Sequence, residues 1–308
     1  MASISQILTA SFPAILAKTK SAENQWAESA LMRELERQGA IKRIGLGPTI
    51  EVQLDYRRNP GAAVQASELA GFATSKTEIL AGGSYTPAEI VVPMTWSNLD
   101  EATNSSEVQK VALVKQIATN ALTSHDDVME QAFFQTTTNG LLGLLTHVVD
   151  AGTGIDGGID SSTETWWRNQ QATYVDDTDI EAAFTSVEHA CAKGSGGKRP
   201  SLMVSDGATQ AIFEGTQQAN QRYNDSQDLK AGFKTIMFIN ARYVFSPYGT
   251  SRVFFLNADN FNVVVSKEFF RDKREPQALE GQTGTRSVLY SALQYVTNNR
   301  SRLGVAHI

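Results

Sequence analysis

A long helical pattern near the middle of the chain limits the possible folds more than any other feature. From about Ser105 to Phe134 the apolar residues recur at the spacing of one helix face, and Asn104 with Glu107 provides a start signal for that helix. At 1.5 Å per residue, a helix of this extent is roughly 45 Å long, which exceeds the width of a small domain. We therefore expect it to act as a spine to which other parts of the chain attach.

Two strand patterns precede the spine helix, and a long polar stretch separates them. In residues 49–56 apolar and polar side chains alternate strictly, which predicts a half-exposed strand. Residues 89–96 form a second strand pattern, in which Pro93 indicates an edge position. The roughly thirty residues between them are rich in glycine, alanine, serine and threonine, and such long loops are usually functional or disordered. We expect a projecting ribbon, which is marginally stable alone and should lie on a partner.

The rest of the chain divides into an N-terminal arm, a helix and a C-terminal lobe. Residues 1–20 show no lasting helical period and predict an arm that packs on another surface, whereas residues 22–38 predict a helix that ends at Gly39. Residues 140–265 alternate short helical and strand patterns, which indicates an α/β lobe. The last segment, residues 266–308, ends in an apolar stretch that predicts a terminal strand.

The stretch from Lys193 to Ser201, KGSGGKRPS, is similar to a phosphate-binding loop in composition but not in context. Ala192 stands where the first glycine of that motif belongs, and Arg199 stands where its magnesium-binding hydroxyl belongs. A phosphate-binding loop also follows a strand and opens a helix. Here a helical pattern precedes the loop and the strand pattern of residues 202–204 follows it. We therefore interpret the stretch as a helix-to-strand connection.

The sequence offers no set of residues for catalysis, cofactor binding or metal binding. The histidines are scattered, and the single cysteine, Cys191, shares an apolar helical stripe, so we expect a core thiol. The acidic residues from Asp176 to Asp179 fit the first turn of a helix. Residues 150–160 lack the calcium-loop register and are interpreted as a flexible loop. We predict that the protein is not an enzyme and has no cofactor or metal site.

The composition excludes several classes of partner. With 308 residues, of which 41% are hydrophobic and 19% charged, the chain has the composition of an ordinary ordered protein. Its net charge of −6 argues against a general nucleic-acid binder, which would need a basic face. No segment has the length of a membrane span or the pattern of a signal peptide. We expect a protein that is made in the cytoplasm and does not bind membranes.

Four short motifs, together with the order of the predicted elements, resemble those of one protein family. The motifs are Trp166-Trp167-Arg168, Arg199–Ser205, Arg242–Asn257 and Asn299–Ile308. The layout of arm, helix, ribbon, spine helix, α/β lobe and returning strands resembles that of the major capsid protein of tailed bacteriophages, which has the Hong Kong 97-type fold. The resemblance extends over nearly the whole chain.

The resemblance implies an α+β subunit with four regions. They are an N-terminal arm and helix in residues 1–40, a projecting E-loop ribbon in residues 41–97, a P-domain with the spine helix in residues 98–145 and 266–308, and an α/β A-domain in residues 146–265. In the family, the A-domain lies around the axes of hexamers and pentamers.

The resemblance also implies a structural function in the virion. Copies of the chain would self-assemble as hexamers and pentamers into an icosahedral head that encloses double-stranded DNA without sequence-specific contacts. Assembly would take place in the host bacterial cytoplasm, and a rounded procapsid would later mature by expansion. The chain lacks a long charged helical N-terminal extension, so a separate scaffolding protein is implied. A portal protein is a further partner, and a decoration protein is an optional one.

Contacts between subunits are the functional sites that this interpretation predicts. Arg57 and Arg58 in the ribbon are candidate partners for acidic patches on a neighbouring subunit, and the alternative is a solvated tip. Some relatives crosslink a lysine to an asparagine, but no local motif supports that chemistry here. The other contact candidates are Trp26, Lys76, Trp166, Trp167 and Arg168.

Two other functions remain open. One is an encapsulin-like nanocompartment, in which the same fold encloses an enzyme cargo, and a cargo-binding site would distinguish it. The other is a soluble α/β enzyme in which residues 57–88 form a lid over a cleft of titratable residues. That alternative predicts a monomer or a small oligomer, and the scattered histidines argue against it.

Overall fold

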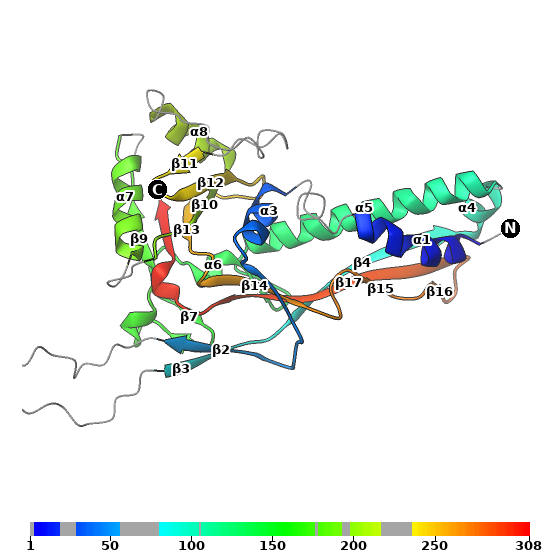
Figure 1. Ribbon diagram of the computed structural model, residues 1–308, viewed down its shortest axis with the longest axis horizontal. Coiled ribbons are helices and arrows are strands. Elements are labelled where there is room, and N and C mark those ends of the chain that lie inside the picture. The colour runs from blue at the N-terminus through cyan, green and yellow to red at the C-terminus, as the bar shows by residue number, and fades with distance from the viewer. Residues whose placement is uncertain are drawn as a thin grey trace, which may run out of the picture.

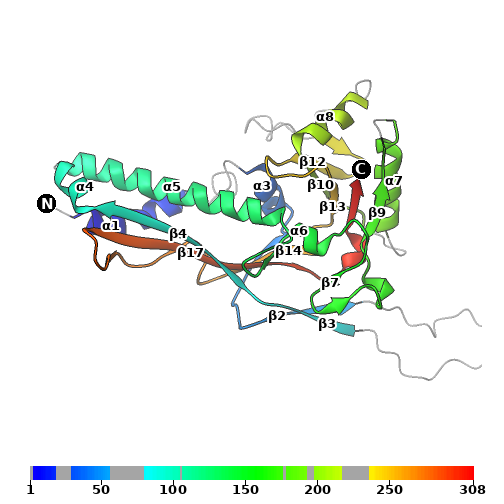
Figure 2. The same ribbon diagram turned by 180° about the vertical axis from the view of Figure 1, so that it is seen from behind.

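A computed structural model of the chain describes residues 3–18, 29–55, 80–104, 106–175, 178–192, 198–216 and 236–308. The molecule has an elongated body, built on one long helix and a long sheet, and a lobe with its own sheet at one end of that body (Figure 1). A two-stranded ribbon leaves the molecule at the lobe end of the body (Figure 2). This arrangement confirms the mixed α+β class that the sequence predicted.

Helix α5 (Glu107–Phe133) is the predicted spine, and it lies lengthwise along the long sheet (Figure 1). It begins at a capping box, in which the Ser106 hydroxyl accepts a hydrogen bond from the Gln109 N–H and the Gln109 side chain accepts one from the Ser106 N–H. The predicted start signal at Asn104 is wrong, because Asn104 is the C-cap of the preceding helix α4 (Asn98–Thr103).

The long sheet is built around β17 (Gly284–Thr297). Strand β4 (Ala88–Ser97) pairs antiparallel along one side of β17, and β14 (Phe261–Ser266) pairs antiparallel on the other side. In the described part of the chain β4 has no second partner strand, so the edge position predicted from Pro93 is confirmed. The remaining strands of this sheet are β1 (Ile41–Ile44), β15 (Asp272–Lys273) and β16 (Gln277–Ala278).

Helix α1 (Ile4–Lys18) corrects the prediction of an arm without helical structure. The side chains of Ile4, Leu8 and Phe12 are buried against α5 and the long sheet, since a spacing of four residues puts them on one helix face. Pro13 is tolerated inside the helix at an exposed position. The helical pattern was hard to recognise in the sequence because only one row of large apolar residues forms the buried face of the helix. A proline, which is unusual inside a helix, also interrupts the pattern.

Helix α3 (Ala30–Arg37) lies between the body and the lobe (Figure 1). The Ser29 hydroxyl caps its first turn by accepting a hydrogen bond from the Met32 N–H at 3.1 Å. Gly39, with φ of +74°, follows the helix in the left-handed conformation, so the predicted helix end is confirmed. The first part of the predicted helix, residues 22–28, lies outside the described residues.

The lobe contains a six-stranded sheet in the order β11-β12-β10-β13-β18-β9. One face of this sheet packs on α7 (Ile180–Cys191) and α8 (Gly207–Thr216), and the other face contributes to the core of the body. Cys191 is a buried core residue on the face that packs on α7 and α8, as predicted. The strands are β9 (Gln170–Thr173), β10 (Leu202–Ser205), β11 (Ile236–Phe238), β12 (Ala241–Phe245), β13 (Val253–Leu256) and β18 (Gly304–His307).

Two strands lie on the other side of the division that was predicted between residues 265 and 266. Strand β14 was assigned to the lobe, but it pairs with β17 and β1 in the long sheet. Strand β18 was assigned to the body, but it pairs with β13 and β9 in the lobe. A short apolar run predicts that a strand exists, but it does not specify the partner strand.

The ribbon pairs β2 (Ile50–Asp55) with β3 (Leu80–Tyr85) in antiparallel register. The predicted pairing with residues 89–96 is wrong, because those residues form β4 in the long sheet. The sequence of β3, LAGGSY, has too few large side chains to give an alternating pattern. Residues 57–79, which make up most of the predicted tip between residues 57 and 88, lie outside the described residues.

Short elements connect the body to the lobe. The β7–β8 hairpin turns through Gly157 and Gly158, whose φ angles are +60° and +81°. Because residues 155–160 form this hairpin, the prediction of a flexible loop in residues 150–160 is wrong. The connecting elements are β5 (Thr137–Thr138), β6 (Leu141–Leu142), α6 (Leu144–His147), β7 (Ile155–Asp156), β8 (Ile159–Asp160), η1 (Thr165–Trp167) and η2 (Arg300–Arg302).

Candidate assembly surfaces and the root of the ribbon

The predicted contact residues in the N-terminal region and the ribbon all lie outside the described ranges of the chain. These residues are Trp26, Arg57, Arg58 and Lys76, and their contacts stay predictions. The structure does place the tryptophan motif, at the junction of the β7–β8 hairpin and the lobe.

Trp167 is a core residue, which corrects its prediction as a contact between subunits. Its side chain has no exposed surface, and its indole N–H donates to the Asp156 carbonyl oxygen at 3.1 Å. Trp166 is half-buried, and Arg168 is exposed but donates to the carbonyl oxygen of Ser161 at 2.9 Å. Trp166 and Arg168 therefore remain accessible to a neighbouring subunit, while Trp167 is not.

Tyr85, the last residue of β3, attaches the root of the ribbon to the body. Its side chain is buried, and its hydroxyl donates to the Thr297 carbonyl oxygen at the end of β17, at 3.1 Å. The neighbouring Ser84 N–H donates to the Gly157 carbonyl oxygen in the β7–β8 turn at 3.1 Å. Burial, with the charge of Asp156 as a second cause, raises the pKa of Tyr85. The hydroxyl therefore stays protonated and available as a donor.

A buried polar cluster beneath Tyr85 joins the hairpin to the C-terminal segment. The His147 Nδ1 atom lies 3.0 Å from the Asp156 carboxylate, and neither side chain is exposed. Arg300 is also fully buried, and its Nε–H donates to the His147 carbonyl oxygen at 2.6 Å. Its Nη1 group donates to the Gly154 carbonyl oxygen at 3.0 Å and to the Ser161 hydroxyl at 2.9 Å. Burial lowers the pKa of Arg300, and the Asp156 charge acts in the opposite direction.

The histidine–aspartate pair in this cluster has no geometry for catalysis. The His147 ring packs against Tyr85 and Phe261, with centroid distances of 5.9 and 5.6 Å. Its Nε2 atom is buried and meets no hydrogen-bond partner in the part of the chain that the structure describes. A general base must reach a substrate or a nucleophile, so we interpret the pair as structural. The same described residues contain no group of three metal-binding side chains.

A Gly157→Ala substitution is expected to disturb the ribbon root. The new Cβ would lie 2.8 Å from the Tyr85 hydroxyl oxygen, at a position with φ of +60°. Gly281 has a similar φ of +70° but open space around it, so Gly281→Ala is the matched control for backbone strain alone. We expect both variants to lose about 1–2 kcal/mol from strain and Gly157→Ala to lose roughly 1 kcal/mol more from the collision. Equal losses in urea unfolding would contradict the collision.

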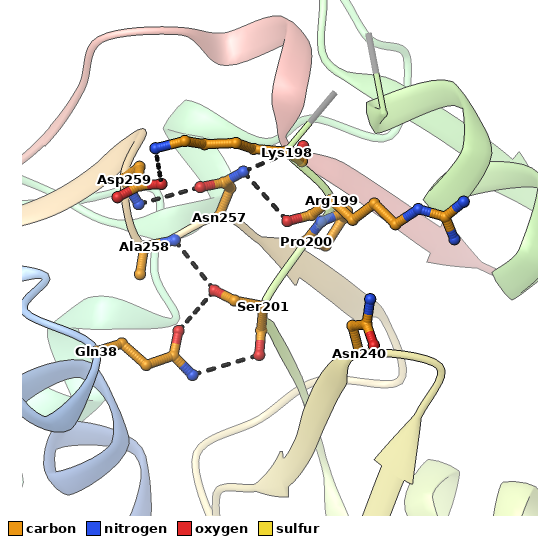
Figure 3. Close-up of a pocket in the computed structure, with 9 residues that line it drawn as sticks. All are labelled: Gln38, Lys198, Arg199, Pro200, Ser201, Asn240, Asn257, Ala258 and Asp259. Atoms are coloured by element: carbon orange, nitrogen blue, oxygen red, sulfur yellow. Dashed lines mark hydrogen bonds and ion pairs between the residues drawn. The ribbon is translucent and has the colours of Figure 1, made fainter. Parts of the chain in front are cut away.

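An open pocket of about 670 Å³ lies at the start of β10, beside the loop that is similar to a phosphate-binding loop (Figure 3). Lys198 pairs with Asp259 at 2.6 Å, and Arg199 pairs with Glu188 at 3.0 Å. Because Lys198 and Arg199 already have carboxylate partners, the described lining of the pocket does not favour an anion site. The interpretation as a helix-to-strand connection agrees with this geometry, although residues 193–197 lie outside the described residues.

The polar side chains of this pocket hold its own walls together (Figure 3). The Asn257 amide donates to the carbonyl oxygens of Lys198 and Arg199 at 3.4 and 3.2 Å. The Ser201 hydroxyl donates to Gln38 at 2.6 Å and thereby connects the end of α3 to the lobe. The pocket therefore belongs to the joint between α3 and the lobe.

The outer end of the spine carries exposed apolar side chains. Leu99 in α4 is 70% exposed, and Val108 and Val111 in α5 are 80% and 48% exposed. Exposed apolar side chains that gather in one region can mark a contact surface. No helix in the described residues is long and apolar enough to cross a lipid bilayer.

No protein-family profile and no curated protein matches the chain, but solved structures do. A cyanophage A-1(L) capsid structure matches with a TM-score of 0.62 and 14% identity, over 89% of this chain and 92% of that chain. A Mycobacterium phage Bobi structure matches with a TM-score of 0.58 and 12% identity, over 87% and 88%. The holo-SrpI encapsulin complex from Synechococcus elongatus matches with a TM-score of 0.56 and 7% identity, over 89% and 86%. At these identities the likeness shows the fold alone.

Proposed function

We propose that this chain, which has the fold of phage capsid proteins, is the major subunit of a phage head. Copies would assemble as hexamers and pentamers into an icosahedral shell around double-stranded DNA. The main support is the likeness to the cyanophage capsid, which extends over 89% of this chain and 92% of the other. A match of this breadth must include most of the body and most of the lobe rather than one common motif.

The shape of the subunit supports a role in an assembly. The β2–β3 ribbon is a two-stranded sheet that extends away from the body (Figure 2). Such a ribbon is marginally stable in water unless it packs on something. A neighbouring subunit would provide that surface, and contacts spread over a large area suit a closed shell.

The regions of the family are assigned to this chain as part of the proposal. Residues 41–97 would form the E-loop, residues 98–145 with most of 266–308 the P-domain, and residues 146–265 most of the A-domain. Because β14 pairs within the long sheet and β18 within the lobe sheet, we would assign β14 to the P-domain and β18 to the A-domain. The remaining contact candidates between subunits are Trp26, Arg57, Arg58, Lys76, Trp166 and Arg168.

The proposed partners follow from a shell of this type. The chain would need a scaffolding protein and a portal protein during assembly, with a decoration protein as an optional addition. The net charge of −6 fits a wall that encloses DNA without binding it strongly. Assembly would occur in the bacterial cytoplasm, and the mature protein would be part of the virion.

An encapsulin-like nanocompartment is the second candidate, because the SrpI encapsulin complex has a similar fold. A virus-like particle from Pyrococcus furiosus also matches, over 98% of both chains. In that case the shell would enclose a protein cargo instead of DNA. The contents of particles isolated from the native source distinguish the two candidates.

The first test of this proposal is the mass and shape of the purified protein. We expect light scattering and negative-stain microscopy to show hollow shells, or hexamers and pentamers that close into shells when scaffolding protein is added. DNA inside particles from virions would support the phage head, and a protein cargo would support the nanocompartment. A compact monomer that persists with the other head proteins present would overturn both.

A further inference from the structure

A buried carboxylate lies at the joint between the spine helix, α3 and the lobe. Glu130 in α5 is only 6% exposed. It accepts a short hydrogen bond from the Ser246 hydroxyl, which lies in the turn between β12 and β13. It also accepts a hydrogen bond from the Ser29 hydroxyl at the N-terminus of α3. One side chain therefore connects three elements that belong to different parts of the fold.

The turn that contacts Glu130 is held by hydrogen bonds to β10 and within itself. The Ser246 N–H donates to the Ser205 carbonyl oxygen at 3.0 Å, which extends the β10–β12 ladder. The N–H groups of Tyr248 and Gly249 donate back to the hydroxyl and carbonyl oxygens of Ser246, at 3.3 and 3.0 Å. A change in the bond between Ser246 and Glu130 would therefore act on the end of the β10–β12 ladder in the lobe sheet.

The charged groups around Glu130 disfavour its ionised form. Asp126 and Asp127, on the same helix, are the charged groups that act on it, and both are acidic. Among the described residues no cation pairs with Glu130. Arg271, a buried cation next to this part of α5, pairs with Asp126 instead. A buried carboxylate without a cationic partner is costly to ionise.

The groups on the other packed elements do not compensate for this cost. From the β12–β13 turn, the Tyr248 hydroxyl donates to Asp127. From β17, the Tyr295 hydroxyl donates to the Met129 carbonyl oxygen at 2.7 Å. From α3, the Glu34 carboxylate faces Arg242 and Arg37. Ser29 and Ser246 are thus the only described groups that stabilise the ionised form of Glu130 by hydrogen bonds.

We propose that Glu130 is a proton-sensitive latch that holds the lobe to the spine when it is protonated and loosens this joint when it ionises. Burial, as the largest cause, raises the pKa of Glu130 in the folded protein. The native joint therefore binds the proton more tightly than the unfolded chain does. Its stabilisation is complete below the unfolded pKa and is lost as the pH rises through the folded pKa. The joint lies within one subunit, so this inference does not depend on the proposed shell.

Amide hydrogen exchange of the Ser246, Tyr248 and Gly249 N–H groups tests the latch. We would measure their protection, corrected for intrinsic exchange rates, from about pH 5 to about pH 8 in the full chain. In the natural protein we expect protection to fall as the pH rises, by up to about tenfold per pH unit for one proton. A Glu130→Gln variant cannot ionise, so its protection should be high and independent of pH.

Two further variants make the outcome specific to this carboxyl group. Glu107→Gln makes the same chemical change at an exposed site on the same helix, and its pH profile should match that of the natural protein. Asp127→Asn removes a neighbouring negative charge, so the pH at which protection falls should move lower. Parallel profiles of the natural protein and Glu130→Gln would overturn the proposal. If Glu130→Gln does not fold, an unchanged midpoint in Asp127→Asn would do so.

Discussion

An Asp156→Ala variant is expected to lose about 3–5 kcal/mol of unfolding free energy, because it leaves a buried cation without its counter-charge. Among the described residues, the donors of Arg300 reach neutral oxygens, on His147, Gly154 and Ser161. Asp156 is the acidic side chain that acts on this buried guanidinium. The substitution also removes the carboxylate that faces the His147 Nδ1 atom at 3.0 Å. Urea unfolding, followed by tryptophan fluorescence, measures the loss.

Two controls separate the causes of this effect. Asp259→Ala breaks the exposed ion pair with Lys198, so it should cost no more than about 1 kcal/mol. Asp156→Asn keeps an acceptor oxygen for His147 but removes the charge, so its loss should be intermediate. If Asp156→Ala cost no more than Asp259→Ala, the cluster would not be a main support of the ribbon root.

The part of the fold that Asp156→Ala destabilises is as informative as the total loss of unfolding free energy. Tyr85 and Ser84 connect the ribbon to the residues around this cluster, through Thr297 and Gly157. In Asp156→Ala the Ser84 N–H should therefore exchange faster. The end of the β4–β17 ladder at Gly284 and Ser97, which lies at the opposite end of the body from the cluster (Figure 1), should keep its protection. Such a difference would show that the direction of the ribbon is set at its root.

The elements that the sequence predicted well are those with a long or strict period. The spine helix and the alternating strand at residues 50–55 have regular patterns, and their existence follows from residue spacing alone. Partners and registers were less predictable. The true partner of that strand, β3, contains Gly82 and Gly83, which give no apolar alternation. Pairing depends on contacts between distant residues, which local spacing does not encode.

The motifs on which the family resemblance was based make contacts between elements within the subunit. Asn257 ties the loop before β10 to the end of β13, and Ser205 bonds to Tyr243 in the neighbouring strand at 2.7 Å. Trp167 and Arg300 are both buried in the cluster around Asp156. The resemblance was a sound guide to the fold for this reason, but the same residues were weak candidates for contacts between subunits.

The buried carboxylates had no usable signal in the sequence. Asp156 lies in a glycine-rich stretch that reads as a loop, and its partner His147 is nine residues away without a metal-ligand or catalytic spacing. Glu130 is an ordinary polar residue on a long helix until the lobe and α3 cover it. Burial of a charged group by distant segments is a tertiary property, so only the structure identifies these two sites.

A Gly304→Ala variant is expected to lose about 1–3 kcal/mol, because α7 packs directly against the backbone of β18. The added Cβ would lie 2.4 Å from the Val187 Cγ1 atom and 2.9 Å from the Cys191 Sγ atom. Gly82→Ala, also within a strand, meets nothing within 4 Å and is the matched control. It should change stability by no more than about 0.5 kcal/mol.

A double-mutant cycle shows whether this contact with α7 is the cause. Val187→Ala removes the methyl group that the new Cβ would strike, so the two changes together should cost less than the sum of the two alone, by about 0.5–3 kcal/mol. Additive losses would mean that Gly304 is required for its backbone rather than for space. Coupling would explain why the motif Asn299–Ile308 has glycine at position 304. Strand β18 is an inner strand between β13 and β9, and α7 covers it without room for a side chain at this position.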